Sequence, residues 1–121
     1  MKIIYTKSAP KPVGPYSQAI LAGNTLYCSG QIGIDPSKGA LVESLEGQTL
    51  QIMKNISEVL KEAGMSFNNV VKTTCFLNDM NDFAKFNEIY AKYFVSNPAR
   101  SCVQAKLPKG ALAEVEVVAI K

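Results

Sequence analysis

Two short, mostly apolar runs near the end of the chain carry charged side chains that could take part in chemistry. The first run, residues 98–103, contains Arg100, and the second, residues 113–120, contains Glu114 and Glu116. If the two runs pair as neighbouring β-strands, the guanidinium and the carboxylates come to lie side by side. Such a pair offers a fixed cation for a planar anion, with carboxylate oxygens near enough to handle a water molecule or a proton. The pattern is therefore consistent with a site for a small planar anion.

The residue types that the chain lacks limit this chemistry further. There is no histidine among the 121 residues, which removes Ser-His and Cys-His nucleophile systems, imidazole bases and nearly all zinc sites. The three cysteines are widely spaced, without a Cys-x-x-Cys pair, so we expect reduced thiols in a cytoplasmic protein. We therefore expect no metal and no cofactor, and a chemistry that uses side chains, backbone groups and water.

Length and charge predict a single domain and argue against nucleic acid as a partner. The 121 residues suffice for a single domain over residues 1–121 with one hydrophobic core. The net charge of +3 is small and the basic residues are scattered, so nucleic acid is not an expected partner. No window approaches the roughly 18 apolar residues of a membrane span, and the first residues are too short and strand-like for a secretory signal. We expect no membrane association.

Hydrophobic periodicity predicts the elements that position the charged residues. Strands are predicted, in addition to the two runs above, over residues 2–6, 16–21, 25–29 and 70–77. One helix is predicted over residues 45–63, and a second begins at a cap on Asp79 or Asn81 and runs to about residue 95. This content predicts an α+β fold with both helices on one face of a mixed sheet. The other face is expected to be buried against copies of the chain in a closed oligomer.

Four further positions are candidates for the walls of a binding cleft. Tyr16 follows the rigid pair Gly14-Pro15 and either walls the cleft or is an ordinary half-buried strand tyrosine. Gly30 lets main-chain groups approach a ligand closely, while Ser29 lacks a base that could make it a nucleophile. Asn87 interrupts an aromatic stripe on the second helix; it either bonds a neighbouring backbone group or orients the site.

Six short motifs are spread over the full length of the chain. They are Gly14-Pro15-Tyr16-Ser17-Gln18-Ala19, Ser29-Gly30-Gln31, Asp82-Phe83 through Phe86-Asn87, Pro98-Ala99-Arg100-Ser101-Cys102-Val103, Leu107-Pro108-Lys109-Gly110 and Glu114-Val115-Glu116. No single motif is decisive. In this order, over this length, they resemble the Rid/YjgF family of reactive-intermediate deaminases.

The resemblance implies a fold, an assembly and a reaction. The implied fold is a chorismate-mutase-like α+β fold, assembled as a homotrimer in which the sheets form a central barrel and three clefts lie at the subunit boundaries. The implied reaction is hydrolysis of 2-imino acids, such as 2-iminobutanoate and 2-iminopropanoate, to 2-oxo acids and ammonia. The implied partners are therefore small 2-imino and 2-oxo carboxylic acids and other copies of the chain.

The resemblance also implies roles for individual residues. The arginine that matches Arg100 binds the substrate carboxylate, and the glutamate that matches Glu114 positions the attacking water. The backbone at Cys102 meets the imine end of the substrate. The residues implied to line the cleft are Tyr16, Ser29, Gly30 and Asn87. We do not expect the Cys102 thiol to act as a nucleophile, because imine hydrolysis needs no covalent intermediate and a cysteine is often simply buried.

Two departures from the family pattern bear on the site. The segment between Arg100 and the Leu107-Pro108 pair is one residue shorter than is usual in the family. A one-residue change in length can move every side chain of the following strand to the other face, unless a bulge or the loop takes up the change. The face on which Glu114 lies therefore depends on this loop, and Glu116 is the alternative water-positioning residue. Gly33 stands where the family commonly has a proline, which could loosen one rim of the cleft.

Other interpretations of the same residues stay open at this point. Arg100 could form an ion pair with Glu114 or Glu116 and bind no ligand, and the glutamates could be solvated charges on a strand that guard against aggregation. The chain could also be a trimeric module that holds a small carboxylate or a partner protein without catalysis. RNA binding or cleavage is the least favoured function, because histidine and a basic patch are both absent.

Overall fold

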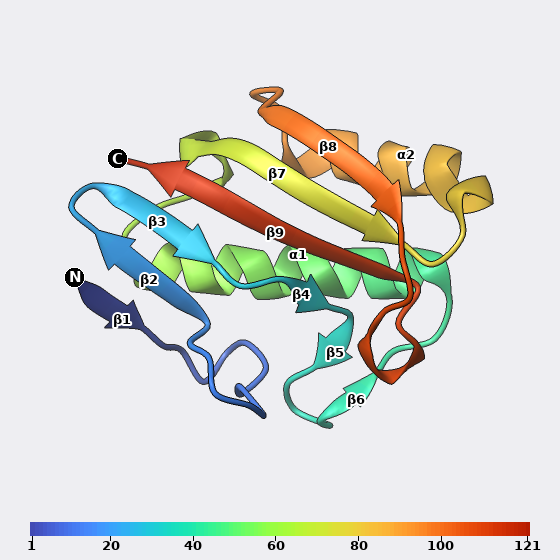
Figure 1. Cartoon of the computed structure of the whole chain (residues 1–121), viewed down its shortest axis with the longest axis horizontal. Coiled ribbons are helices and arrows are strands. Elements are labelled where there is room, and N and C mark those ends of the chain that lie inside the picture. Colours follow the sequence, from blue (N-terminus) through green and yellow to red (C-terminus); the bar gives the residue numbers. More distant parts are fainter.

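One mixed sheet and two helices on a single face of it form the structure, a computed structural model that describes residues 1–121 (Figure 1). The helices are α1 (Leu45–Glu62) and α2 (Phe83–Tyr93). The strands of the sheet are β1 (Lys2–Ile4), β2 (Ala19–Ala22), β3 (Thr25–Cys28), β4 (Gln31–Ile32), β7 (Val70–Leu77), β8 (Ala99–Gln104) and β9 (Ala113–Ile120). The two-residue strands β5 (Ile34–Asp35) and β6 (Ala40–Leu41) pair with each other apart from it. The predicted α+β fold is confirmed.

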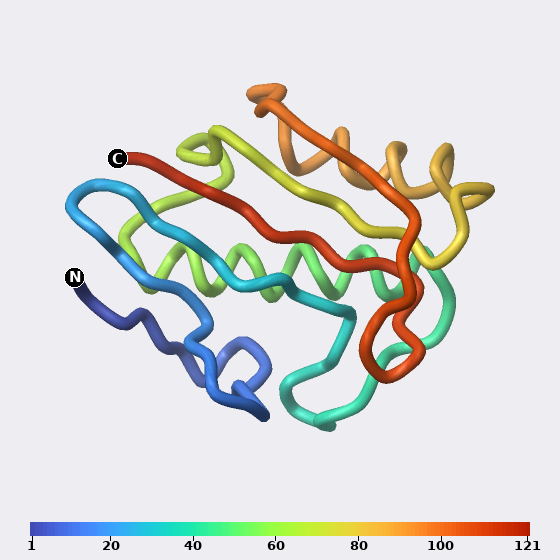
Figure 2. Tube along the Cα trace, viewed as in Figure 1, coloured from blue at the N-terminus to red at the C-terminus, as the bar shows by residue number.

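The order of strands across the sheet is β1-β2-β3-β9-β7-β8, and β4 also pairs with β9 (Figure 2). Only β7 and β8 run parallel, because the chain returns from β7 to β8 through α2. That return places β8 on the outer side of β7, while β9 pairs with the inner side. The prediction that the two C-terminal runs pair with each other is therefore wrong, since β7 separates them.

Helix α1 forms where apolar residues recur at helical spacing. Its start is capped by Ser44, whose side chain accepts a hydrogen bond from the Gly47 N–H. Its end coincides with Gly64, which adopts a left-handed φ of 73°. The Lys121 ammonium donates to the carbonyl of Ala63 at 2.9 Å, so the last residue of the chain binds the end of the helix.

Helix α2 follows a short three-ten turn over Met80–Asp82. The Asp79 carboxylate accepts a hydrogen bond from the Asn81 N–H at 2.9 Å and caps this turn. The N-cap of α2 itself is Asp82, so the prediction that Asp79 or Asn81 caps the second helix is wrong, because the three-ten turn comes before the helix. Asn97 then takes a left-handed φ of 54° just before Pro98, a turn that lets the chain leave the helix and enter β8.

The core lies between the sheet and the two helices. Along β9 every second side chain points toward the helices and is buried, namely Ala113, Val115, Val117 and Ala119. The residues between them, Glu114 and Glu116 among them, point to the opposite face. The face that a side chain occupies is therefore fixed by its place in this alternation.

The face of the sheet away from the helices carries apolar side chains that nothing in the chain covers. Tyr27, Val103 and Ile120 are 54%, 48% and 41% exposed. Burial of this face against other copies of the chain stays a prediction. Neither helix has the length and hydropathy that would be needed to cross a bilayer.

Candidate functional site

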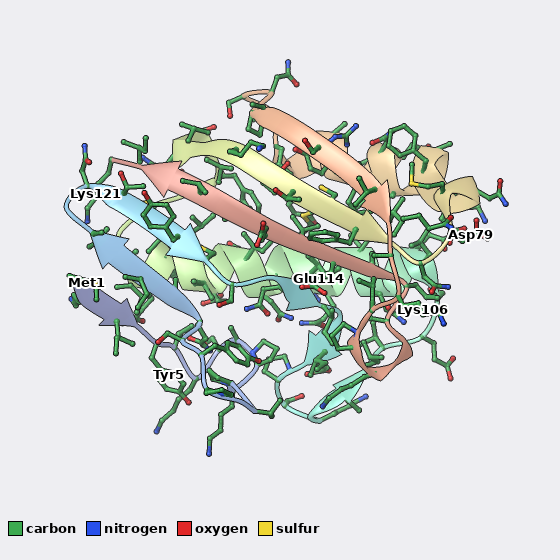
Figure 3. The ribbon with its side chains drawn as sticks, in the orientation of Figure 1. Met1, Tyr5, Asp79, Lys106, Glu114 and Lys121 are labelled. Atoms are coloured by element: carbon green, nitrogen blue, oxygen red, sulfur yellow. The ribbon has the colours of Figure 1, made fainter.

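A hollow of about 440 Å³ opens on the uncovered side of the sheet, where β4 meets β9. Four of the predicted cleft and catalytic residues line it together, namely Tyr16, Ser29, Gly30 and Glu114. The rest of the lining comes from the proline-rich segment after β1, from β4 and β5, and from the loop before β9. Figure 3 shows Glu114 at the beginning of β9, beside β4.

The carboxylate of Glu114 lies directly against the backbone of Gly30. A Cβ atom built on Gly30 would be 2.9 Å from the carboxyl carbon of Glu114 and closer still to Oε2. Only glycine leaves room for the carboxylate at this position. Glu116 lines the same hollow, but the three atoms nearest to this Cβ position all belong to Glu114. Glu114 points to the uncovered face of the sheet, opposite to its buried neighbours Ala113 and Val115.

Glu114 is half-buried beside a second carboxylate. Burial, and then the charge of Glu116, raise the pKa of Glu114 above its ordinary value. We expected a nearby Arg100 to hold this glutamate ionised, and within one chain that expectation is wrong, because Arg100 lies on the other face of the sheet. In an isolated chain, the Glu114 carboxylate therefore has no arginine beside it.

Ser29 and Tyr16 line this hollow in different ways, since the Ser29 hydroxyl is bonded within the chain and the Tyr16 side chain is open to solvent. The Ser29 hydroxyl donates to the carbonyl of Ser17 at 2.6 Å, so its hydrogen is already engaged. Ser29 is thus a structural residue of the rim and not an activated nucleophile. The Tyr16 side chain is 52% exposed, which leaves its ring and hydroxyl open to a ligand.

Gly33, in place of the proline common in the family, lies against helix α1. A Cβ atom at Gly33 would be 2.6 Å from the Cα of Gln48, so the glycine allows strand and helix to approach closely. Two buried amides hold the same rim: Asn55 donates to the carbonyl of Ile34 at 3.0 Å, and Gln48 accepts from the Leu112 N–H at 2.8 Å. These contacts hold the rim in this chain, and the loosening by Gly33 stays a prediction.

Gln18 is a residue of this site that sequence reasoning placed in a motif without giving it a role. Its side chain is 2% exposed and accepts a hydrogen bond from the Thr6 N–H at 2.8 Å. Its amide donates to the carbonyls of Thr6 and Pro10, both at 3.0 Å. Gln18 therefore fastens the proline-rich segment that leads to Tyr16. The only signal in the sequence was a polar side chain inside the Gly-Pro-Tyr motif.

Arg100 forms the centre of a second region, on the helix side of the sheet. It is in register with Thr73 of β7, whose side chain is fully buried beneath the helices. Its Nη1 donates to Asn87 Oδ1 at 2.6 Å. Its guanidinium lies over the rings of Tyr90, 4.7 Å from the centroid, and Phe83, 5.3 Å from the centroid. A hollow of about 300 Å³ adjoins these groups.

The surroundings of Arg100 decide between the interpretations that the sequence left open. Asn87 bonds the Arg100 side chain and not a neighbouring backbone group. The Asn87 amide is also the only hydrogen-bond acceptor of the guanidinium in the chain, so no glutamate pairs with it. Arg100 is the only arginine in the sequence. It is therefore a held cation whose Nε and Nη2 donors have no partner within the chain.

The thiols near Arg100 are in their protonated form. Cys102 lies two residues from Arg100 and in register with Cys75 of β7. Burial raises the pKa of Cys102 although Arg100 lowers it in part, and burial raises the pKa values of Cys75 and Cys28 to about 12. A protonated thiol is a poor nucleophile, which agrees with the expectation for Cys102. No group of three or more cysteine, aspartate or glutamate side chains is arranged to hold a metal ion.

The predicted site residues thus form two half-sites that one chain keeps apart. Arg100, Asn87 and Cys102 lie toward the helices, whereas Glu114 and its neighbours line the hollow on the uncovered face. A small molecule that touches both a guanidinium and a glutamate must therefore lie between two chains.

Comparison with known proteins relates this arrangement to others. The sequence profile described as Endoribonuclease L-PSP matches residues 6–121. A human protein named 2-iminobutanoate/2-iminopropanoate deaminase is 54% identical over 123 residues, which cover 99% of this chain and 90% of the human one. The crystal structure of RidA from an Antarctic Psychrobacter is 41% identical and superposes with a TM-score of 0.97 over the whole of both chains. The structure of E. coli TdcF with bound serine is 36% identical, with a TM-score of 0.96 over 100% of this chain and 99% of that one.

Proposed function

Because this chain belongs to the Rid/YjgF family, whose profile is described as Endoribonuclease L-PSP, we propose that it hydrolyses 2-imino acids such as 2-iminobutanoate and 2-iminopropanoate to 2-oxo acids and ammonia. The human, mouse and rat relatives that carry the deaminase name are 50–54% identical to it. The residues of the two half-sites fit this chemistry.

Arg100 is proposed to bind the substrate carboxylate. Its guanidinium is fixed by Asn87 and by two aromatic rings, and two of its nitrogens have no acceptor within the chain. A planar carboxylate can accept two parallel hydrogen bonds from such a fork. This unpaired cation, the only arginine of the chain, is the observation that carries the proposal.

Glu114 is proposed to position the attacking water. An imine carbon is already electrophilic, so the site has to align water and substrate more than activate either. Water adds to the carbon of the protonated C=N group while the glutamate accepts one proton of the water, and the glutamate then gives this proton to the nitrogen of the carbinolamine. The glutamate takes the remaining hydroxyl proton as the C–N bond breaks, ammonia leaves, and the 2-oxo acid remains. Tyr16, Gly30 and the Cys102 backbone complete the walls around the reacting atoms.

The proposed site is shared between copies of the chain in a homotrimer. Arg100 and Glu114 cannot reach one substrate within a single chain, so each site takes its arginine from one copy and its glutamate from the next. A heterologous contact of this kind generates a closed ring when the rotation between successive copies closes on itself, as it does in a trimer. The apolar side chains on the uncovered face supply a surface for such contacts.

The test is deamination of an imine made in situ. A threonine dehydratase supplies 2-iminobutanoate, and release of 2-oxobutanoate is followed in the presence of a scavenging amine that competes for the imine. We expect the purified protein to accelerate the release and Arg100→Ala to abolish the acceleration while the oligomer, measured by light scattering, stays intact. Full activity of Arg100→Ala would contradict the proposal.

The alternative is a trimeric module that binds a small carboxylate, or a partner protein, without catalysis. The same assay distinguishes the two when 2-oxobutanoate is also titrated by calorimetry. Binding that depends on Arg100 without any turnover supports the module. Turnover that depends on both Arg100 and Glu114 supports the deaminase.

A further inference from the structure

We propose that Tyr90 is a positioning residue for Arg100 and that the buried hydroxyl of Thr73 holds Tyr90 in place. This inference rests on the proposed function, in which Arg100 binds the substrate carboxylate. It concerns two residues that act through the arginine and have no part in the reaction itself.

The contacts of Thr73, Tyr90 and Arg100 form a closed triangle. Thr73 lies beside Arg100 in the register of β7 and β8. The Tyr90 hydroxyl and Thr73 Oγ1 share a hydrogen bond of 2.7 Å, and the Tyr90 ring lies under the guanidinium at 4.7 Å. Thr73 therefore positions Arg100 in two ways. It lies beside the Arg100 backbone in the paired strands, and it bonds the tyrosine whose ring lies under the guanidinium.

Helix α2 supplies the remaining contacts along one stripe. Phe83, Asn87 and Tyr90 are separated by four and three residues, so they lie on the same face of the helix. All three contact the Arg100 side chain. The register of this helix against β8 therefore determines where the guanidinium points.

Contacts that fix the guanidinium before a carboxylate binds should make binding more favourable. An arginine side chain carries about 2 kcal/mol of rotamer entropy, and part of it is lost when a bidentate pair forms. Contacts that are already made before the ligand arrives reduce that loss. Asn87 accepts a hydrogen bond from Nη1, and the aromatic rings pack against the plane of the guanidinium. Nε and Nη2 are therefore held in a fixed orientation but have no acceptor within the chain.

The tyrosine hydroxyl is not needed for packing alone. The Tyr90 ring is in contact with Phe94, 4.4 Å between centroids, and with Phe86 at 5.8 Å, contacts that a phenylalanine would make equally well. A hydroxyl in this buried position instead demands a partner, and Thr73, fully buried, provides it. Burial also raises the pKa of Tyr90, so the ring beneath the cation remains neutral.

The sequence makes a direct measurement possible, because Arg100 is the only arginine. Arginine labelled with nitrogen-15 gives one Nε signal and one set of Nη signals, all from this residue. In the wild-type protein we expect slow rotation about the Cζ–Nε bond, seen as separate Nη signals. In Tyr90→Phe and Thr73→Val we expect faster rotation and merged signals. Thr73→Ser, which keeps the hydroxyl, should restore the wild-type pattern.

Ligand affinity and kinetics give the second readout. For Tyr90→Phe and Thr73→Val we expect the Kd of 2-oxobutanoate and the KM of the imine to rise roughly threefold to tenfold, with kcat within about twofold of wild type. Thr73→Ser should again behave as wild type.

Two outcomes separate this inference from the proposed function. If 2-oxobutanoate leaves the wild-type Arg100 signals unchanged and no turnover occurs, the proposed function fails, while merged signals in the two variants would still support positioning by Tyr90. If Tyr90→Phe and Thr73→Val lower the melting temperature but keep separate Nη signals and an unchanged Kd, Tyr90 is a core residue only and the inference is overturned.

Discussion

Arg100 and Glu114 point to opposite faces of the sheet, although each lies on a strand that pairs with β7. Arg100 is in register with Thr73 and Glu114 with Phe76, three positions further along the same strand. An odd separation along a strand reverses the face, so the arginine points to the helices and the glutamate to the uncovered side. One chain therefore holds the half-site of Arg100 and the half-site of Glu114 in two different places.

Mixed oligomers test whether active sites are shared between chains. Arg100→Ala and Glu114→Gln are each expected to be inactive alone. When the two variants are unfolded together and refolded in equal amounts, about one quarter of the sites should combine an intact arginine with an intact glutamate, as random assembly in a ring with heterologous interfaces requires. Deaminase activity of the mixture, relative to wild type treated in the same way, measures this fraction.

The control for that experiment is the mixture without subunit exchange. The two variants combined as folded oligomers should stay inactive until exchange occurs. A refolded mixture without activity, from oligomers shown by mass spectrometry to contain both variants, would show that each site draws both residues from one chain.

Gly30 should be irreplaceable because of the carboxylate that lies on it. In Gly30→Ala the new methyl group would overlap the Glu114 carboxylate and turn it away from the hollow. We expect kcat to fall by about 100-fold or more, in line with the loss of a positioned catalytic group. Steady-state kinetics with 2-iminobutanoate measure the loss.

Gly23→Ala is a matched control for Gly30→Ala. Gly23 has a left-handed φ of 61° in the turn between β2 and β3, and a Cβ atom there meets nothing within 4 Å. The left-handed backbone costs a non-glycine residue about 1 kcal/mol, so this variant loses stability without touching either half-site. Equal losses of kcat in both variants would show that Gly30 acts through stability and not through Glu114.

Part of this architecture follows from local sequence, and part does not. Strand β7 has the predicted bounds, residues 70–77, and α1 ends within one residue of its predicted end, because periodicity and a terminal glycine are local signals. The position of β9 between β3 and β7 depends on pairing between distant segments, for which periodicity carries no information. The predicted proximity of Arg100 and Glu114 failed at this step.

The same distinction holds for the candidate site. The motifs drew attention to Arg100, Glu114 and Gly30 through residue type. The role of Tyr90 was hidden, because a tyrosine in an aromatic helical stripe is typical of ordinary core packing. Its contact with Arg100 arises only when α2 docks on β8, so no pattern within the helix could indicate it.

The acid limb of the pH profile should depend on Glu116. Burial and Glu116 both raise the pKa of Glu114, and the ionised carboxylate is the form that accepts a proton from water. The acid limb of kcat/KM should therefore lie at a higher pH with Glu116 present than without it. Glu116→Gln removes the neighbouring charge, so we expect the limb to move to lower pH. A limb that stays in place would show that Glu116 does not act on Glu114.

Folding should favour the protonated form of Glu114, whereas the proposed reaction needs the ionised form. A raised pKa means that folding favours the protonated form, so the contribution of Glu114 to stability is present below its unfolded pKa and is lost as the pH rises through the folded value. Glu114→Gln, which stays neutral at every pH, should therefore unfold at a temperature equal to or above that of wild type at pH 7. A lower melting temperature at pH 7 would show that the ionised carboxylate has a stabilising partner in the assembly.

Gln18 should matter for stability as well as for the shape of the hollow. Gln18→Leu keeps the volume but leaves the Thr6 N–H and the carbonyls of Thr6 and Pro10 without their buried partner. We expect the free energy of unfolding to fall by about 2–4 kcal/mol, since each unsatisfied buried group costs about 1–3 kcal/mol. Urea unfolding at one fixed protein concentration measures the loss, because oligomers gain stability with concentration.

The same substitution at Gln104 separates the effect of burial from that of residue type. Gln104 is exposed and accepts one hydrogen bond, from the Met80 N–H at 2.9 Å, so Gln104→Leu should cost no more than about 1 kcal/mol. Amide hydrogen exchange at Thr6 should become faster in Gln18→Leu and stay unchanged in Gln104→Leu, because only Gln18 protects that group. If the Thr6 amide keeps its protection when Gln18 is replaced, the segment before Tyr16 is held by its prolines and not by this buried amide.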